Sequence, residues 1–238
     1  MKGNTYLALD FTSWDEAEHF LKENDLHGVP VKVGMELFYR EGPRIIEKLK
    51  ANDHGIFLDL KLHDIPTTVM KAMKNLARLE VDMVNVHALG GSEMINRAKE
   101  GLLSGSPASH DTKLIAVTVL TSMDETALNN ELKIPGSVAD NATHFAGFAA
   151  ENGADGVVCS VHEASRVKAA CGSFFLTVTP GIRLQETDVN DQRRVATPVF
   201  AKENGADILV VGRTVTQAKD PKTAYLQVQE EWGHGSTP

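Results

Sequence analysis

Three charged side chains stand close together in the stretch GIFLDLKLHDIPTT, residues 55–68. The apolar residues at its start indicate a buried strand, within which Asp59 and Lys61 lie two residues apart. Side chains with this spacing point to the same face of a strand, with Cα atoms about 6.7 Å apart at a rise of about 3.3 Å per residue. Asp64 follows just beyond the expected end of the strand. A carboxylate beside an ammonium at this place is typical of either a buried ion pair or a reaction centre.

This stretch alone leaves both interpretations open. An ion pair between Asp59 and Lys61 could be structural, although the cost of removing two charges from water makes such pairs poor stabilisers. Asp64 precedes Ile65 and Pro66, so it could cap a following helix that has proline in its first turn. We favour chemistry for Asp59 and Lys61 because the rest of the chain provides a setting for it.

The composition is that of a globular protein and argues against several classes. The chain has 238 residues, of which 42% are hydrophobic, and a net charge of -8. It lacks the basic stripe with which a general nucleic-acid binder contacts phosphates. It also lacks the apolar core of a signal peptide and the roughly 18 apolar residues of a membrane span, so we expect a cytoplasmic protein. Neither the cysteines nor the histidines have ligand spacing, so we expect free thiols and no metal.

Apolar runs that favour strands alternate with helical patterns along the chain. The expected strands are at 6–10, 29–34, 55–61, 82–87, 114–121, 156–160, 174–179 and 208–212, and the expected helices are at 13–23, 43–51, 66–79, 92–103, 139–152, 162–171, 194–204 and 223–232. Eight such units predict a parallel sheet closed into a single (β/α)₈ barrel over residues 1–232, followed by a disordered tail at 233–238. An open doubly wound sheet is the alternative, but no GxGxxG fingerprint follows the first strand.

In such a barrel, function gathers at the carboxyl ends of the strands. The first expected strand ends in Asp10, the second contains Lys32, and the third ends with Asp59 and Lys61. A single inward lysine could be a packing accident with a snorkelling head group. Charges of alternating sign on three adjacent strands favour a functional array. Thr121 is followed by Ser122 at the end of the fifth strand, where the pair could donate hydrogen bonds, although this signal is weak alone.

A second polar set follows the seventh and eighth strands, where barrels often bind phosphate. The seventh strand leads into Thr179-Pro180-Gly181-Ile182-Arg183, and the eighth ends in Gly212-Arg213. Gly212 would permit close approach of the backbone to an anion, and Arg213 could contact it through two nitrogens. The polar loop 183–191 has the length of a lid. The alternatives are that Arg213 is an ordinary surface residue and that the loop is only solvated.

Five segments together resemble the orotidine 5'-monophosphate decarboxylase family, and most closely its compact bacterial form. The sequence DLKLHDIPTTV at 59–69 matches the Asp-x-Lys-x-x-Asp signature of that family. The other matching segments are KVGMELF at 32–38, TPGIR at 179–183, DQRRVATP at 191–198 and VVGRTVT at 210–216. Leu184 stands where many relatives have proline, which affects the stiffness of the lid and leaves the assignment of activity intact.

The resemblance implies a homodimeric barrel that converts orotidine 5'-monophosphate to UMP and CO₂ in pyrimidine synthesis without a metal or an organic cofactor. By position, Lys61 is then the proton donor and Asp59 lies against the substrate carboxylate. Asp64 and Thr68 are implied to reach into the site of the neighbouring subunit. Loss of CO₂ leaves a carbanion with no adjacent carbonyl to delocalise it, so a lysine that supplies both a compact cation and a proton suits the reaction.

The resemblance also implies contacts along the rest of the substrate. Asp10 and Lys32 correspond to contacts with the ribose and the charge array, and Thr121 and Ser122 to contacts with the pyrimidine. The positions that correspond to phosphate contacts are Arg183, Gln192, Gly212 and Arg213, and Pro180 corresponds to a further contact with the substrate. No membrane and no nucleic acid is implied as a partner.

Two other functions remain as alternatives. A sugar-phosphate decarboxylase or aldolase on a similar barrel shares Asp-x-Lys-x-x-Asp but uses Mg²⁺, held in part by a glutamate on the second strand. Lys32 takes that place here, and its charge would oppose the metal. A catalytically silent nucleotide binder on the same fold is the second alternative. The complete set of charges counts against it, since binding requires the phosphate contacts but not the lysine–aspartate array.

Overall fold

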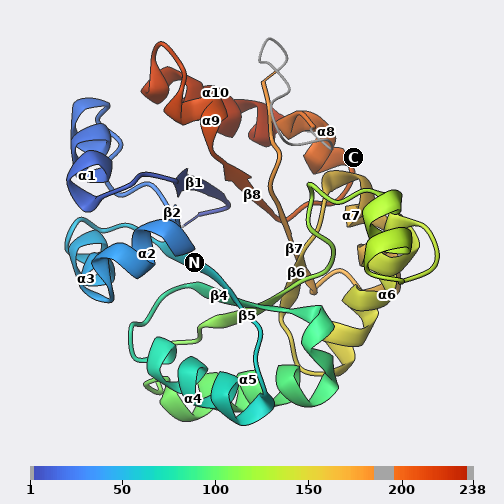
Figure 1. The fold of residues 1–238 in the computed structure, drawn as a ribbon. Coiled ribbons are helices and arrows are strands. Elements are labelled where there is room, and N and C mark those ends of the chain that lie inside the picture. Colours follow the sequence, from blue (N-terminus) through green and yellow to red (C-terminus); the bar gives the residue numbers. More distant parts are fainter. Residues whose placement is uncertain (1–2, 185–195, 235–238) are drawn as a thin grey trace.

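The computed structural model describes residues 3–184 and 196–234, in which eight parallel strands form one closed barrel. This confirms the predicted (β/α)₈ fold. Each strand pairs with the next along the chain, and β8 pairs with β1 to close the ring seen in Figure 1. The strands are β1 (Thr5–Leu9), β2 (Val31–Gly34), β3 (Ile56–Leu62), β4 (Met83–His87), β5 (Lys113–Val117), β6 (Gly156–Val158), β7 (Leu176–Thr179) and β8 (Ile208–Val211).

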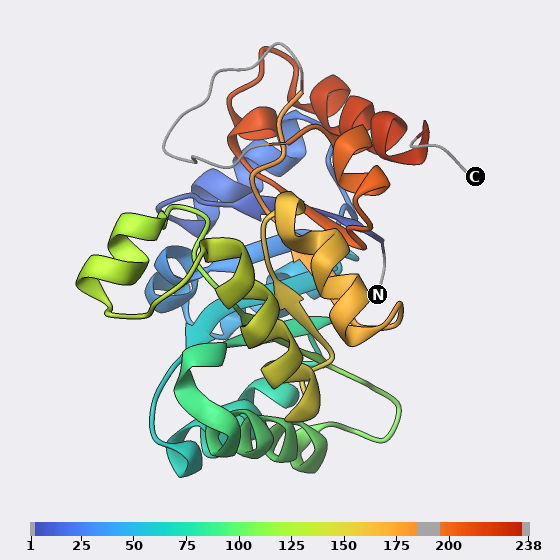
Figure 2. The same cartoon turned by 90° about the vertical axis from the view of Figure 1, so that its right-hand side faces the viewer.

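Helices cover the outside of the ring in both Figure 1 and Figure 2. The helices at expected places are α1 (Trp14–Glu23), α3 (Arg44–Ala51), α4 (Pro66–Ala77), α5 (Gly91–Gly105), α6 (Val138–Glu151), α7 (Val161–Cys171), α8 (Pro198–Glu203) and α10 (Pro221–His234). A π-helical turn at Ala127–Glu131 lies within the polar stretch 121–138, where the sequence predicts a loop with a short helix. The structure adds α2 (Met35–Glu41), α9 (Arg213–Thr216) and a 3₁₀ turn at Ala88–Gly90. These additions are too short to produce a clear helical period in the sequence.

Some boundaries differ from those expected. Strand β5 ends at Val117 rather than at 121, because both neighbouring strands end opposite that residue, β4 at His87 and β6 at Val158. Helix α8 begins at Pro198, and Thr197 caps it by accepting a hydrogen bond from the backbone of Phe200; the expected start at 194 lies outside the described residues. Helix α10 continues to His234, two residues past the expected end of the domain, and 235–238 lie outside the described residues.

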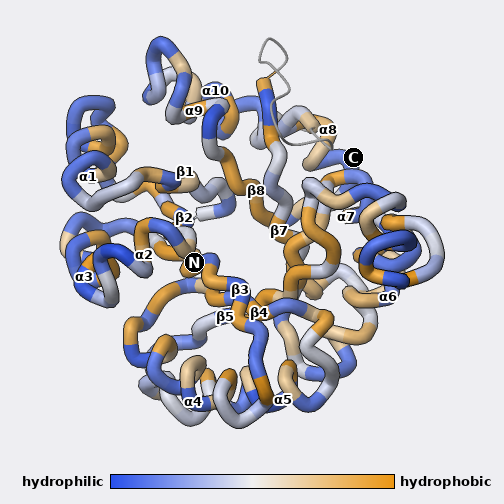
Figure 3. The backbone as a smooth tube through the Cα atoms, in the orientation of Figure 1, coloured by the Kyte–Doolittle hydropathy of each residue, from blue (hydrophilic) through white to orange (hydrophobic). Residues whose placement is uncertain are grey.

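The alternation of side chains along the strands divides the apolar core into two parts. Outward-facing residues such as Leu7, Val33 and Leu58 pack under the helices. The inward-facing residues that fill the barrel are Tyr6, Ala8, Phe57, Met83, Ile115, Val178, Ile208 and Val210. In Figure 3 the strands are largely hydrophobic, whereas blue stretches are prominent on α1 and α6. Asp10 follows Ala8 and Asp59 follows Phe57 at the next inward positions, so the charged residues stand directly above this apolar layer.

Two further features of the described residues bear on the class of the protein. Cys159 and Cys171 are both thiols and form no disulfide, as predicted. No helix within 3–184 and 196–234 is long and apolar enough to cross a membrane.

Candidate active site

A cavity of about 490 Å³ opens at the carboxyl ends of the strands. Ala8, Phe57 and Val210 of the apolar layer form its floor. The side chains above that floor come from several strands and from the segments that follow them, and many of them are polar or charged. The cavity therefore offers an apolar base with a charged wall, which suits a ligand that has both a flat ring and anionic groups.

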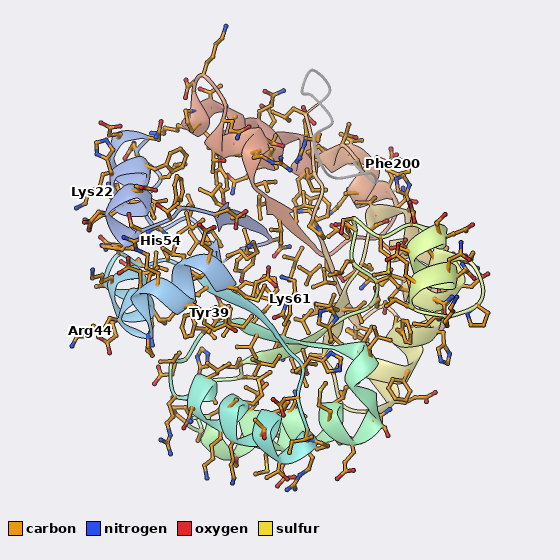
Figure 4. All side chains as sticks on the ribbon, viewed as in Figure 1. Lys22, Tyr39, Arg44, His54, Lys61 and Phe200 are labelled. Carbon is orange, nitrogen blue, oxygen red and sulfur yellow. The ribbon has the colours of Figure 1, made fainter. Side chains whose placement is uncertain are left out.

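Four charged residues of alternating sign form a continuous chain along one wall of the cavity. The Nζ atom of Lys32 lies 3.1 Å from Oδ1 of Asp10 and 3.3 Å from Oδ2 of Asp59. The Nζ atom of Lys61 lies 2.7 Å from Oδ1 of Asp59. Figure 4 shows Lys61 within the ring of strands, whereas Lys22 lies at the outer edge of the molecule. The structure thus brings together the four charges predicted to meet at the ends of β1, β2 and β3.

Burial makes the centre of this chain electrostatically strong. The side chains of Lys32 and Asp59 are 11% and 12% exposed, whereas that of Asp10 is 65% exposed. Burial alone would raise the pKa of Asp59, but the ammonium groups of Lys32 and Lys61 outweigh it, so the pKa lies below its ordinary value. Burial likewise opposes the charge of Lys32, and Asp59 and Asp10 reverse the effect, so the pKa of Lys32 is raised. Asp59 is therefore an anion and Lys32 a cation at neutral pH.

Lys61 departs from regular strand geometry. Its φ is 51°, in the left-handed region that costs a residue other than glycine roughly 1–2 kcal/mol. The register between β3 and β4 shifts in the same place, between Leu58 and Leu62. The simple two-residue alternation expected for Asp59 and Lys61 is therefore interrupted, although their side chains still meet. Strain of this kind persists only where surrounding contacts hold it, and it clusters at functional sites.

Asn85 of β4 completes the charged wall and was missed in the sequence. Its side chain is fully buried, its Nδ2 donates to Oδ1 of Asp59 at 2.6 Å, and its Oδ1 accepts from the backbone N–H of Lys61 at 2.6 Å. A signal was present: Asn85 stands between two apolar residues in MVNVH, at the inward position after Met83. A polar residue on that face, one strand from Asp59, predicts a contact with it once the register is known.

Two arginines stand at the phosphate end predicted for the cavity. Arg183 and Arg213 both line it, together with Pro180 and Gly212. Arg183 is only 7% exposed, and its guanidinium donates to the backbone oxygen of Ile182 at 2.9 Å. Burial and the neighbouring charge of Arg213 lower the pKa of Arg183 from its ordinary value. Two cations held near each other on one wall make this end attractive to a phosphate.

Three further residues near this end were missed. The hydroxyl of Thr214 donates to the Ile182 oxygen at 2.7 Å and accepts from Arg183 at 3.3 Å, so it holds the guanidinium in place. Thr216 and Gln217 also line the cavity. They belong to α9 and its end, which the sequence did not reveal as a helix. Gln192 and most of the predicted lid lie outside the described residues.

The remaining predicted residues divide between the cavity lining and the exposed surface. Thr121 lines the cavity, whereas Ser122 is exposed and is not part of the lining. Asp64 and Thr68 are also exposed, on the segment that leads into α4 and on its first turn. The interpretation of Asp64 as the cap of α4 is wrong. Ile65 occupies the cap position, and the Asp64 carboxylate accepts only the adjacent N–H of Ile65, at 2.6 Å.

The arrangement can stabilise a negative charge and deliver a proton to it. Lys61 and Lys32 both line the cavity and have a proton to give, and Lys61 is the more exposed of the two, at 27% against 11%. Asp59 beside it would repel a ligand carboxylate placed there. Among the described residues, no cluster of three or more His, Cys, Asp or Glu side chains could hold a metal ion.

The chain resembles proteins of known activity along nearly its whole length. The model of the orotidine 5'-phosphate decarboxylase / HUMPS family matches residues 3–228. The orotidine 5'-phosphate decarboxylase of Geobacillus thermodenitrificans is 51% identical over 234 residues, 97% of each chain. That of Bacillus cereus strain AH820 is 51% identical over 233 residues, 98% of each chain. The crystal structure of the Lactobacillus acidophilus orotidine 5'-phosphate decarboxylase superposes with a TM-score of 0.86 at 44% identity, covering 97% of this chain and 99% of the other.

Proposed function

Since the chain belongs to the orotidine 5'-phosphate decarboxylase / HUMPS family, we propose that it converts orotidine 5'-monophosphate to UMP and CO₂ in the pyrimidine synthesis of the cytoplasm. The observation that carries this proposal is the charge chain from Asp10 to Lys61 at one side of a cavity that has Arg183 and Arg213 at its other end. A ligand with a phosphate at one end and an ionised ring carboxylate at the other matches both ends.

In the proposed reaction Lys61 protonates the reacting carbon. The bond between C6 and the carboxylate breaks, its electron pair stays on C6, and CO₂ leaves. A proton from Nζ of Lys61 then forms the C6–H bond of UMP. A preorganised cation at the site where negative charge develops is worth more than the same cation in water, because it needs no reorganisation. The Nζ atom of Lys61 lies 2.7 Å from Oδ1 of Asp59, and this position supports the role proposed for Lys61.

Asp59 is proposed to lie against the substrate carboxylate. Two carboxylates in a partly desolvated site repel each other, and the departure of neutral CO₂ relieves that repulsion. The lowered pKa of Asp59, which Lys32 and Lys61 maintain against burial, keeps it ionised for this purpose. Asp10 and Lys32 are proposed to contact the ribose of the substrate. The ammonium of Lys32 then has two functions, because it also holds Asp59 in place.

Binding of the phosphate supplies the free energy that this crowding requires. Arg183, Gln192, Gly212 and Arg213 are proposed to hold it, at a distance from the reacting carbon. Binding energy from a remote group can be used to hold the reacting groups in an otherwise unfavourable arrangement. The two arginines on the cavity wall support this assignment. Thr121 and Ser122 are proposed to contact the pyrimidine between the two ends.

A second copy of the chain is proposed to complete the site. Asp64 and Thr68 are exposed, on the segment that follows Lys61 and on the first turn of α4. The exposed apolar residues Ile65 and Tyr39, each 68% exposed, occur on the same segment and on α2. Contiguous exposed apolar side chains are typical of a protein interface, and we propose that Ile65 and Tyr39 belong to one. In the proposed homodimer, Asp64 and Thr68 reach the cavity of the neighbouring subunit.

The metal-dependent alternative finds less support in the charge chain. A divalent ion would require the carboxylates of Asp10 and Asp59, and the ammonium of Lys32 already lies 3.1 and 3.3 Å from them. Its positive charge would oppose a second cation in the same place. We therefore propose that the reaction needs neither a metal nor an organic cofactor. The silent nucleotide binder is disfavoured because the buried lysine–aspartate array costs desolvation energy that phosphate binding does not require.

The test is the loss of ultraviolet absorbance of orotidine 5'-monophosphate with purified protein in excess EDTA. The wild type should turn over, whereas Lys61→Ala should lose at least about 10⁴-fold in kcat, since it removes both the proton and the cation. Lys22→Ala is the control, because Lys22 is a surface lysine with a 57% exposed side chain. Near-normal turnover by folded Lys61→Ala would refute its role. A folded, dimeric wild type without turnover would favour the metal-dependent sugar phosphates.

A further inference from the structure

We propose that Asn85 is a positioning residue that locks the carboxylate of Asp59 and the backbone of Lys61 into one rigid unit. This inference deepens the proposed function and rests on it. Asn85 does not line the cavity and takes no part in the bond-breaking and proton-transfer steps, because it is fully buried in β4 behind the charged wall. Its two hydrogen bonds end on the two residues that carry the proposed reaction.

The chemistry of its partners fixes the orientation of the Asn85 side chain. The backbone N–H of Lys61 is a donor, so the amide oxygen must face it, at 2.6 Å. The ionised carboxylate of Asp59 is an acceptor, so the amide nitrogen must face that group, also at 2.6 Å. Asparagine supplies one donor and one acceptor at this spacing. An apolar side chain of the same size supplies neither.

The first effect concerns the carboxylate. Oδ1 of Asp59 accepts from both Asn85 and Lys61 Nζ, at 2.6 and 2.7 Å, and Oδ2 lies 3.3 Å from Lys32 Nζ. Contacts on both oxygens prevent rotation of the carboxylate about its terminal bond. Without Asn85, Oδ1 would retain only the contact with Lys61. The lysine that must deliver the proton would then also be the sole group that orients Asp59 on that side.

The second effect concerns the strained backbone of Lys61. Its left-handed φ of 51° coincides with the register shift between β3 and β4, where regular ladder bonds are interrupted. The oxygen of Asn85 accepts the N–H that this shift removes from the ladder. An unpaired N–H in this buried wall would favour a different backbone conformation. Because φ of Lys61 decides where its side chain points, Asn85 thereby aims the Nζ atom at the cavity.

The first test compares Asn85→Leu with wild type in turnover of orotidine 5'-monophosphate. We expect kcat to fall about 10²-fold or more, the loss seen when one preorganised contact is removed. KM should change less than about threefold, because the arginines that hold the phosphate lie on another wall. The control is Thr112→Val, which removes a buried hydrogen bond to the oxygen of Val81 at the opposite end of the barrel. Thr112→Val should lose a buried hydrogen bond, as Asn85→Leu does, but should keep the turnover of the wild type.

The second variant is Asn85→Asp, whose side chain has nearly the same shape as that of asparagine. In this variant the two hydrogen bonds made at position 85 depend on pH. When protonated, the introduced carboxyl group can donate to Asp59 and accept from Lys61, as the amide does. When ionised, it repels Asp59. Burial and the adjacent carboxylate of Asp59 raise the pKa of the introduced group, and the ammonium groups of Lys61 and Lys32, which contact the same carboxylate, oppose this rise. Relative to wild type at the same pH, kcat should therefore be preserved at acid pH and lost as the pH rises.

Three outcomes separate the ideas. Folded Asn85→Leu with kcat within threefold of wild type would overturn the positioning role. If that variant fails to fold, a profile of Asn85→Asp parallel to wild type from pH 5 to 8 would overturn it equally. If the folded wild type does not turn over orotidine 5'-monophosphate, both the proposed function and the role of Asn85 are overturned. If the wild type is active and the Asn85 variants are unaffected, only the role of Asn85 is overturned.

Discussion

Replacing Lys32 by methionine tests the centre of the charge chain in a way that needs no substrate. The change removes the ammonium and keeps most of the length of the side chain. Lys32 Nζ lies 3.3 Å from Asp59 and 3.1 Å from Asp10. Because Lys32 and Asp59 are both nearly buried and Asp10 is 65% exposed, the loss should come almost entirely from the pair with Asp59.

The expected loss is about 3 kcal/mol in the free energy of unfolding at neutral pH. Two unit charges 3.3 Å apart attract by roughly 5 kcal/mol at an effective dielectric constant near 20, and removal of the lysine also removes its own desolvation cost. Breaking a buried pair from one side costs about 3–5 kcal/mol in general. The lower end applies here, because Asp59 keeps its contacts with Lys61 and Asn85.

The free energy of unfolding that Lys32→Met loses should become smaller as the pH is lowered. The wild-type pKa of Asp59 is lowered from 3.8, so its contribution is complete above that value and is lost as the pH falls through the lower folded value. Without the ammonium group of Lys32, less positive charge counteracts the effect of burial, so the pKa of Asp59 rises. The stability difference between wild type and Lys32→Met should therefore be constant near neutral pH and should shrink as the pH is lowered through the range in which Asp59 titrates.

Urea unfolding of four proteins measures this effect: wild type, Lys32→Met, Asp59→Asn and the double variant. The coupling between the two substitutions should be about 2–3 kcal/mol. Lys22→Met is the matched control, since Lys22 pairs with Glu18 at the surface and should lose less than about 1 kcal/mol. An equal loss on replacing Lys32 with or without the Asp59 carboxylate would refute the reasoning, as would a loss that does not change at acid pH.

Two further predictions concern the phosphate end and the proposed dimer. Arg213→Ala should raise KM for orotidine 5'-monophosphate about 10- to 100-fold and lower kcat by less, and an unchanged KM would remove Arg213 from the phosphate site. Inactive Lys61→Ala and Asp64→Ala chains, mixed and allowed to exchange subunits, should regain about a quarter of wild-type activity, because half of the dimers are hybrids with one complete site. Absence of recovery in proven hybrids would show that Asp64 does not act across the interface.

Much of the fold followed from local patterns in the sequence. Eight apolar runs separated by helical periods predicted the closed barrel, because strand and helix periods depend only on neighbouring residues. The same alternation predicted that Asp10, Lys32 and Asp59 would face the interior. The chain of contacts in the structure confirms that these three residues and Lys61 meet. The segment matches also identified the family, which the comparisons confirm.

The tertiary structure decided what depends on pairing between distant segments. Asn85 is one polar residue in an apolar strand, and only the register of β4 beside β3 places its amide between Asp59 and Lys61. Strand β5 ends at Val117, opposite the last residues of β4 and β6, and the turn beyond it places Thr121 in the cavity lining and leaves Ser122 exposed.

The left-handed φ of Lys61 illustrates the physical reason for this division. Local preference alone would keep a lysine within a strand in an extended conformation. Its actual conformation is stable because contacts from a neighbouring strand, 24 residues away in sequence, hold it. The sequence by itself therefore determined which residues carry charge and which face of the barrel they occupy, since side-chain alternation is a local property. Only the tertiary structure decided how those charged side chains are oriented, because their orientation depends on hydrogen bonds that form after the strands have paired.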